Sequence, residues 1–208
     1  MRILAVSDME SKFIWDHFDP SAFQGIDFII SCGDLKASYL SFIVSMIPAP
    51  LFYVHGNHDT EYLTRPPEGC IDIDGRVVSY RGLRIGGLGG CLGSSPEPFQ
   101  FTEQEMSRRA RRFEGEIKRK RGLDIFVSHA APLGFGDGDD PFHKGFEAFC
   151  QIDAVHEPTL HFFGHKHLSG SPVNKKAVAR LGNTTLVNAT GYRVVDIDEL
   201  QEISNRSV

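Results

Sequence analysis

The sequence predicts an α/β fold, a four-layer α/β/β/α sandwich built from two mixed β-sheets. Three observations support this prediction. First, the chain has 208 residues, 41% of them hydrophobic, without a break in composition, which favours a single domain over residues 1–208. Second, its apolar runs are short and do not alternate with polar residues, which is typical of strands buried on both faces. Third, patterns with helical spacing lie between these runs, so helices are expected to cover the sheets.

Five apolar runs have the length of a strand, and each ends at a polar or glycine-containing cluster. They cover residues 3–6, 28–30, 51–54, 125–127 and 160–163. In open α/β sheets, ligands bind beyond the carboxyl ends of the strands. Polar residues that follow these runs are therefore expected to meet in space although they are far apart in the sequence.

Three segments show the periodicity of a helix. Apolar residues at 39, 43, 46 and 47 share one helical face, and Pro48 ends that helix. Thr102 and Glu105 form a capping-box pattern before apolar residues at 106, 110, 113 and 117. The third predicted helix covers residues 146–156.

Two further regions predict antiparallel strands. Asp74-Gly75 lies between alternating runs in residues 70–90 and predicts a β-hairpin. Near the C-terminus, residues 178–181, 185–187 and 194–197 predict an antiparallel meander. These strands would make both sheets mixed, and the last few residues, 204–208, are expected to be frayed.

Composition restricts the classes of protein. Charged residues make up 24% of the chain and the formal net charge is −5, which gives no general attraction to nucleic acid or acidic membranes. The four cysteines are scattered without a C-x-x-C pair, which predicts reduced thiols. The chain shows no signal-peptide pattern and no apolar stretch near the roughly 20 residues of a membrane-spanning helix. We therefore expect a cytoplasmic protein that does not enter a membrane.

The strand ends carry side chains that bind transition metals. They present carboxylates, an amide and imidazoles: Asp8, Asp34, Asn57, His58, His129, His165 and His167. This mixture of oxygen and nitrogen donors suits Mn, Fe, Zn or Ni. A lone histidine or an isolated Gly-Asp is usually structural, but the pattern recurs at five strand ends. There are too many donors for one tetrahedral ion, so a pair of ions that share a bridging carboxylate fits better.

These clusters resemble the motifs of the calcineurin-like metallophosphoesterase superfamily, in family order and across nearly the whole chain. The family motifs are D-x-H, G-D, G-N-H-[DE], a lone histidine and G-H-x-H. The corresponding residues are Asp8-Met9-Glu10, Gly33-Asp34, Gly56-Asn57-His58-Asp59, His129 and Gly164-His165-Lys166-His167. The G-N-H-D and G-H-x-H elements are the specific ones.

The resemblance implies two divalent metal ions, with Mn favoured and Fe, Zn, Ni or Mg as alternatives. Asp8 and His167 would hold the first ion and Asp34 would bridge both ions. The second ion would be held by Asn57, His129 and His165. Two such cations roughly 3.5–4 Å apart lower the pKa of a bridging water from about 15.7 toward 7. The resemblance implies that the hydroxide formed in this way would attack phosphorus in line.

The resemblance also implies two catalytic residues that are not ligands. His58 would face the substrate, orient its phosphate and protonate the leaving oxygen. Asp59 would fix the tautomer of His58 and keep it basic. The chain is thus expected to be an enzyme, a phosphoric ester hydrolase that acts on a small phosphodiester or phosphomonoester, including nucleotide-type substrates.

Glu10 departs from the family pattern, which usually has histidine at this position. If Glu10 binds the first metal, the site is harder and favours Mn or Mg over Zn. If it points away, the first metal is held weakly. The sequence leaves both alternatives open.

Two other functions compete with hydrolysis of a small substrate. A binding scaffold could keep the fold and lose the chemistry, with Glu10 in its favour and His58 against it. A nuclease would use the basic segment 102–121, where eight Lys and Arg face four Glu, a local charge of +4. We favour a solvated helix face for this segment because no aromatic residues are interleaved. His143 is a further candidate for substrate contact.

Overall fold

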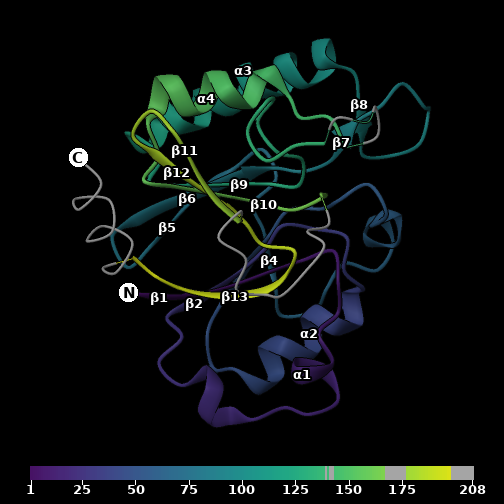
Figure 1. Cartoon of the computed structure of the whole chain (residues 1–208), viewed down its shortest axis with the longest axis vertical. Coiled ribbons are helices and arrows are strands. Elements are labelled where there is room, and N and C mark those ends of the chain that lie inside the picture. The colour runs from purple at the N-terminus through teal and green to yellow at the C-terminus, as the bar shows by residue number, and fades with distance from the viewer. Residues whose placement is uncertain (139, 141–142, 167–176, 198–208) are drawn as a thin grey trace.

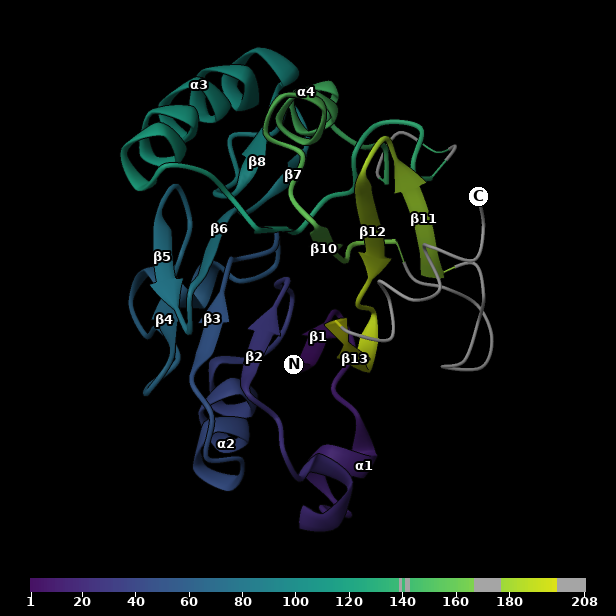
Figure 2. The ribbon, with the colours of Figure 1, turned by 90° about the vertical axis from the view of Figure 1, so that its left-hand side faces the viewer.

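The computed structural model describes residues 1–138, 140, 143–166 and 177–197. Two large sheets pack face to face between two pairs of helices (Figures 1 and 2). Helices α1 (Lys12–Trp15) and α2 (Ala37–Met46) lie on one outer side, and α3 (Glu103–Lys120) and α4 (Glu147–His156) lie on the other. The predicted α/β/β/α sandwich is confirmed.

Each large sheet has a parallel centre and at least one antiparallel edge. The first sheet has the order β13 (Gly191–Asp196), β1 (Arg2–Ser7), β2 (Phe28–Ser31), β3 (Leu51–Tyr53), β4 (Ile71–Asp72), in which only β13 is antiparallel to its neighbour. The second has the order β11 (Val178–Leu181), β12 (Thr184–Asn188), β10 (Leu160–Phe163), β9 (Ile125–Ser128), β6 (Leu83–Leu88), β5 (Val77–Tyr80). Its two edge strands, β11 and β5, are antiparallel to their neighbours. A short parallel pair joins β7 (Cys91–Leu92) to β8 (Gln100–Phe101).

The strands are apolar on both faces because each face packs against a different layer. In β1, Ile3 and Ala5 belong to the core between the two sheets, whereas Leu4 and Val6 pack toward α1 and α2. A third apolar cluster lies under α3 and α4. Burial on both sides explains why the sequence shows continuous apolar runs in place of alternation.

The predicted helices form close to the predicted positions. The capping box is present at α3, where the Thr102 hydroxyl accepts from the Glu105 N–H and the Glu105 carboxylate accepts from the Thr102 N–H. The four predicted apolar positions of this helix are buried. Two short 3₁₀ helices, Pro20–Phe23 and Thr60–Leu63, complete the connections.

Two of the strand predictions were wrong in their connections. The hairpin turns at Arg81-Gly82, whose φ angles of 47° and 83° give the left-handed conformation that a tight hairpin needs. Asp74-Gly75 instead lies in the passage from β4 in the first sheet to β5 in the second. In the predicted meander, β11 and β12 do pair, but β13 crosses to the first sheet and pairs with β1. The predicted frayed tail lies outside the described residues.

None of the helices in the described ranges combines the length and the apolar composition that crossing a bilayer requires.

Candidate metal centre

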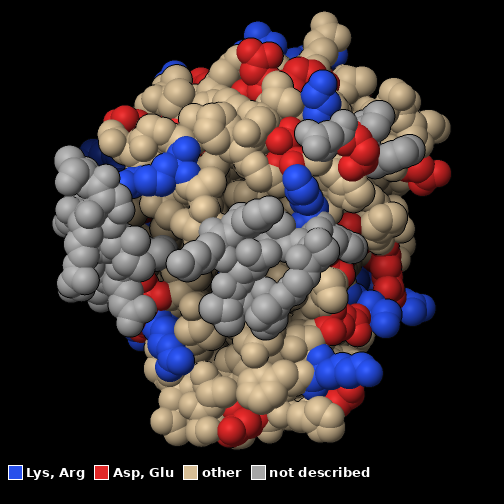
Figure 3. Space-filling model, in the orientation of Figure 1, with Lys and Arg blue, Asp and Glu red and all other residues tan. Residues whose placement is uncertain are grey.

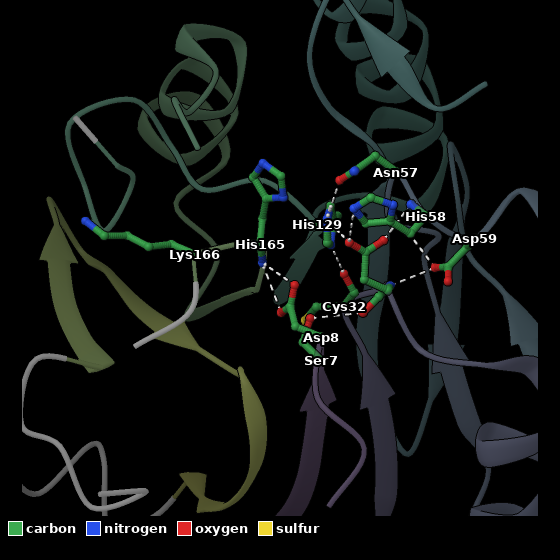
Figure 4. Close-up of polar contacts among 12 residues, drawn as sticks. Ser7, Asp8, Cys32, Asn57, His58, Asp59, His129, His165 and Lys166 are labelled. Atoms are coloured by element: carbon green, nitrogen blue, oxygen red, sulfur yellow. Dashed lines mark hydrogen bonds and ion pairs between the residues drawn. The ribbon is translucent and has the colours of Figure 1, made fainter. Parts of the chain in front are cut away.

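The carboxyl ends of strands from both sheets open on one region of the molecule. Asp8 follows β1, Asp34 lies in the turn after β2, and Asn57 lies in the turn after β3. From the second sheet, His129 follows β9 directly and His165 follows β10. Figure 4 shows Asn57, His58 and His129 close together, with Asp8 beside the backbone of His165.

Four of the predicted ligands form one cluster. Single donor atoms of Asp34, His129 and His165 all lie within 4.8 Å of one another. The Asp34 Oδ2 is 3.4 Å from the His129 Nε2, and the Asn57 Oδ1 is 3.1 Å from the same nitrogen. These four side chains come from four different strand ends, so the convergence predicted from the sequence is present.

The hydrogen bonds of His129 show that this cluster suits a cation. Its Nδ1 is 2.7 Å from the Cys32 carbonyl oxygen and must donate to it, which leaves Nε2 to face Asp34 and Asn57. In the neutral ring, Nε2 is an acceptor that faces the Asp34 carboxylate and the Asn57 amide oxygen, so a cation among these three atoms would be stabilised. Burial lowers the pKa of His129, but the Asp34 carboxylate outweighs burial and raises this pKa to about 9. A proton or a divalent metal ion therefore fits this site.

The pKa of Asp34 is shifted in the opposite direction to that of His129. Burial raises the pKa of its carboxyl group, but the charge and hydrogen bond of His129 prevail and hold this pKa at about 2. The Asp34 Oδ1 also accepts from the backbone N–H of His58 at 2.8 Å. The carboxylate is thus ionised and oriented, as a bridging ligand requires.

Asp8 joins the ends of the two sheets. Its carboxylate oxygens lie 3.1 and 3.0 Å from the backbone nitrogen of His165 and accept its N–H. The Thr190 hydroxyl donates to Asp8 Oδ2 at 3.2 Å. Asp8 therefore lies beside the cluster, where it could hold a first metal ion. His167, its predicted partner as a ligand, lies outside the described residues.

The backbone is strained at three of the candidate ligands. Asp8, Asp34 and His165 have φ angles of 61°, 56° and 64°, in the left-handed region that non-glycine residues seldom adopt. Such conformations cost of order 1–3 kcal/mol each and tend to collect at functional sites. Three strained residues at one site indicate that the orientation of these side chains is maintained at a cost in local stability.

Close approach explains the glycines of the two specific motifs. A Cβ on Gly56 would overlap the Asp34 carboxylate, and a Cβ on Gly164 would overlap the Ser7 side chain. The glycines thus let one strand end reach the donor atoms of the next.

His58 and Asp59 differ sharply in exposure. The side chain of His58 is 81% exposed, and its Nε2 lies 4.0 Å from the Asp34 Oδ2. Asp59 is 4% exposed, and its Oδ2 accepts the backbone N–H groups of Asp34 at 2.8 Å and Gly56 at 2.7 Å. Burial raises the pKa of Asp59 to about 6.

The predicted pairing of Asp59 with His58 is not what the structure shows. In the part of the chain that the structure describes, no hydrogen bond joins Asp59 to the His58 ring. The Asp59 carboxylate points inward and holds the turn after β2 against the turn after β3. Its observed contacts brace the backbone around Asp34.

A cleft of about 400 Å³ opens beside these residues. Its lining residues include Asp8, Asp34 and His58, as well as Glu10. The Glu10 Oε1 is 3.5 Å from the Lys36 Nζ, so its carboxylate forms a salt bridge in this structure. Metal binding by Glu10 stays a prediction. The His143 ring lies 5.1 Å from the His165 ring, and its contact with a substrate stays a prediction.

The sequence did not predict two buried networks that lie behind the cluster. In one, the His55 Nε2 is 3.3 Å from the Asp74 Oδ2, and Arg109 binds both oxygens of Asp74 at 2.6 and 2.7 Å. Phe99 stacks on His55 at 3.7 Å between ring centroids. This network fixes the segment that precedes Asn57. The second network joins His161 to Ser128 and Asp153 by hydrogen bonds.

Two packed mixed sheets with carboxylate, amide and imidazole donors gathered at their strand ends define a candidate metal-binding α/β sandwich. The sequence of residues 1–169 matches the family model described as calcineurin-like phosphoesterase. The chain belongs to this family.

Two solved structures resemble this chain, and the one with a TM-score above 0.5 supports the fold. The crystal structure of TT1561 of Thermus thermophilus is 17% identical, with 95% of each chain covered and a TM-score of 0.69. A structure described as a novel archaeal phosphodiesterase is 13% identical, covers 96% of this chain and 95% of its own, and has a TM-score of 0.47. None of the curated proteins matches the sequence.

Proposed function

We propose that this protein is a metal-dependent hydrolase of small phosphodiesters or phosphomonoesters, including nucleotide-type substrates. The observation that carries the proposal is the convergence of Asp34, Asn57, His129 and His165 around a common centre. Membership of the calcineurin-like phosphoesterase family supports the reaction class.

Seven residues would hold two divalent metal ions, for which Mn is favoured. They are Asp8, Glu10, Asp34, Asn57, His129, His165 and His167. When bound, such ions supply positive charge to the phosphoryl oxygens and lower the pKa of a water molecule. The chain is arranged to bind cations, because Asp34 is ionised and the Nδ1–H of His129 donates to the Cys32 carbonyl, which leaves Nε2 for a metal ion.

His58 would act as the proton donor to the leaving oxygen. Its ring is exposed at the cleft, while its backbone N–H is fixed to Asp34. The ring can therefore reach a substrate bound beside the cluster. A positioned acid of this kind contributes about 10²–10⁴-fold to a rate.

The proposal is tested with a chromogenic aryl phosphodiester and the corresponding phosphomonoester. Protein treated with a chelator and then reloaded with Mn²⁺ should hydrolyse at least one of them. Asp34→Ala should abolish turnover, whereas Asp16→Ala, which removes an exposed carboxylate at the end of α1, should retain it. Absence of Mn-dependent turnover of any phosphoester by the wild-type protein would refute the proposal.

Two alternatives are less well supported. A nuclease would need the basic face of α3, but Arg109 binds Asp74 and Arg119 binds Glu116. On the face shown in Figure 3, Lys and Arg are interspersed with Asp and Glu. A scaffold without activity would be consistent with the Glu10–Lys36 salt bridge, in which the Glu10 carboxylate already has a cationic partner. The exposed His58 at the cleft argues against it.

A further inference from the structure

We propose that Asp153, His161 and Ser128 form a buried relay that positions His129 as a metal ligand. The relay connects helix α4 to the metal centre through the second sheet. This inference rests on the proposed function, because it requires that His129 bind a metal ion.

The relay consists of three short hydrogen bonds. The Asp153 Oδ2 is 2.8 Å from the His161 Nδ1, and the His161 Nε2 is 2.8 Å from the Ser128 Oγ. The Ser128 hydroxyl donates to the carbonyl oxygen of Ala130 at 2.6 Å. Ser128 lies at the end of β9, His161 in β10 and Asp153 in α4.

Burial excludes a second hydrolytic site. Serine, histidine and aspartate in this order form the catalytic triad of many hydrolases. Here, however, Ser128 and His161 are 0% exposed and Asp153 is 1% exposed. A substrate cannot reach the Ser128 hydroxyl, so the set must act on the protein itself.

The direction of the hydrogen bonds can be assigned. A serine hydroxyl has one hydrogen, and Ser128 donates it to Ala130. The Ser128 Oγ must then accept from His161, so the Nε2 of His161 carries a hydrogen. Asp153 holds the opposite ring nitrogen and thereby keeps the ring in this orientation.

This arrangement fixes the backbone on both sides of His129. Ser128 precedes His129 and its side chain is tied to the carbonyl of Ala130, which follows it. The carbonyl of His129 itself accepts from the Gly164 N–H at 2.9 Å. With Nδ1 bound to the Cys32 carbonyl, the His129 ring has little freedom to leave the cluster.

The relay is costly for a purely structural element. Burying polar groups in an apolar core costs free energy unless all of them are hydrogen-bonded. Within the described part of the chain, the Asp153 Oδ1 is buried and has no hydrogen-bond partner. The His161 ring packs against an aromatic side chain, with its centroid 4.2 Å from that of the Phe126 ring. Apolar residues would fill this space more cheaply, so the polar relay is best explained by its connection to His129.

The test compares metal binding in four variants. Asp153→Ala and Ser128→Ala interrupt the relay. Asp153→Asn keeps a partner for His161, because its amide N–H can donate to Nδ1 while Nε2 still carries the hydrogen. Ile152→Ala is the matched control, since Ile152 is equally buried in α4 but belongs to the apolar core. Calorimetry gives the Mn²⁺ affinity, and the absorption spectrum of the Co²⁺-loaded protein reports the ligand geometry.

We expect Asp153→Ala and Ser128→Ala to weaken Mn²⁺ binding by about 10- to 100-fold and to change the Co²⁺ spectrum. Asp153→Asn should recover most of the affinity, and Ile152→Ala should lower the Tm while leaving affinity and spectrum unchanged. Ser128→Ala removes a single oxygen atom and keeps the test decisive if Asp153→Ala does not fold. Wild-type affinity in Ser128→Ala would overturn the relay alone. Failure of the wild-type protein to bind any metal would overturn the proposed function and the relay with it.

Discussion

The turns that follow β2 and β9 hold their candidate ligands by different means. Asp34, after β2, has a left-handed backbone, and its carboxylate accepts from the backbone N–H of His58 and lies against Gly56. His129, after β9, is 0% exposed; its ring donates to the Cys32 carbonyl, and the backbone around it is tied through Ser128 to the His161 side chain of β10. The ligand beside the open cleft is thus oriented largely by backbone groups of the neighbouring turn after β3, and the turn that carries the buried ligand also depends on side chains from β10 and α4.

The largest expected effect is a loss of kcat on removal of His58, which, unlike Asp34 and His129, is not expected to bind metal. His58→Ala should lower kcat by about 10²–10⁴-fold, because the proton donor is lost. The free energy of unfolding should change by no more than about 0.5 kcal/mol, since the side chain is 81% exposed. Steady-state kinetics, thermal unfolding and Mn²⁺ calorimetry check this. Loss of metal affinity in parallel with kcat would show that His58 is itself a ligand.

The dependence of the first turn on backbone geometry can be tested at Gly56. Gly56→Ala would place a Cβ against the Asp34 carboxylate and should destabilise the protein by about 1–3 kcal/mol. It should also weaken Mn²⁺ binding. The matched control is Gly115→Ala in α3, where a Cβ meets open space, and this change should stabilise the protein by about 0.5–1 kcal/mol. Chemical denaturation of both variants gives the comparison, and equal effects would contradict it.

The network around Asp74 should show a pH dependence. Burial raises the pKa of Asp74, but the His55 hydrogen bond and the Arg109 charge prevail and lower it from 3.8 to about 2. Because the folded-state pKa is depressed, its stabilisation of roughly 2 kcal/mol is present above pH 3.8 and is lost as the pH falls toward 2. Asp74→Asn should reduce the slope of unfolding free energy against pH in this range. Superimposable pH curves for the variant and the wild type would refute the assignment.

The contrast between the two turns also explains what the sequence could and could not predict. Asp34 and Asn57 were recognisable because their glycines and neighbours lie next to them in the chain. The relay was not, because Asp153, His161 and Ser128 are common residue types whose proximity depends on the packing of α4 against the second sheet.

The same limit applies to the connections between elements. The three predicted helices and the five apolar runs follow from local patterns, and they lie close to their predicted positions, whereas α1, β7 and β8 were not predicted. The turn at Arg81-Gly82 and the crossing of β13 to the first sheet were missed, since they depend on which strands pair. The inward orientation of Asp59 was missed for a similar reason: its partners include the backbone of Asp34, 25 residues away in the chain.

The most direct test of the metal centre is anomalous X-ray diffraction from crystals of the Mn²⁺-loaded protein. The account predicts Mn peaks at the strand ends, one of them in contact with the Asn57 Oδ1 and the His129 Nε2 and all within reach of the Asp34 carboxylate. Loaded crystals in which no Mn peak lies among Asp34, Asn57, His129 and His165 would contradict it.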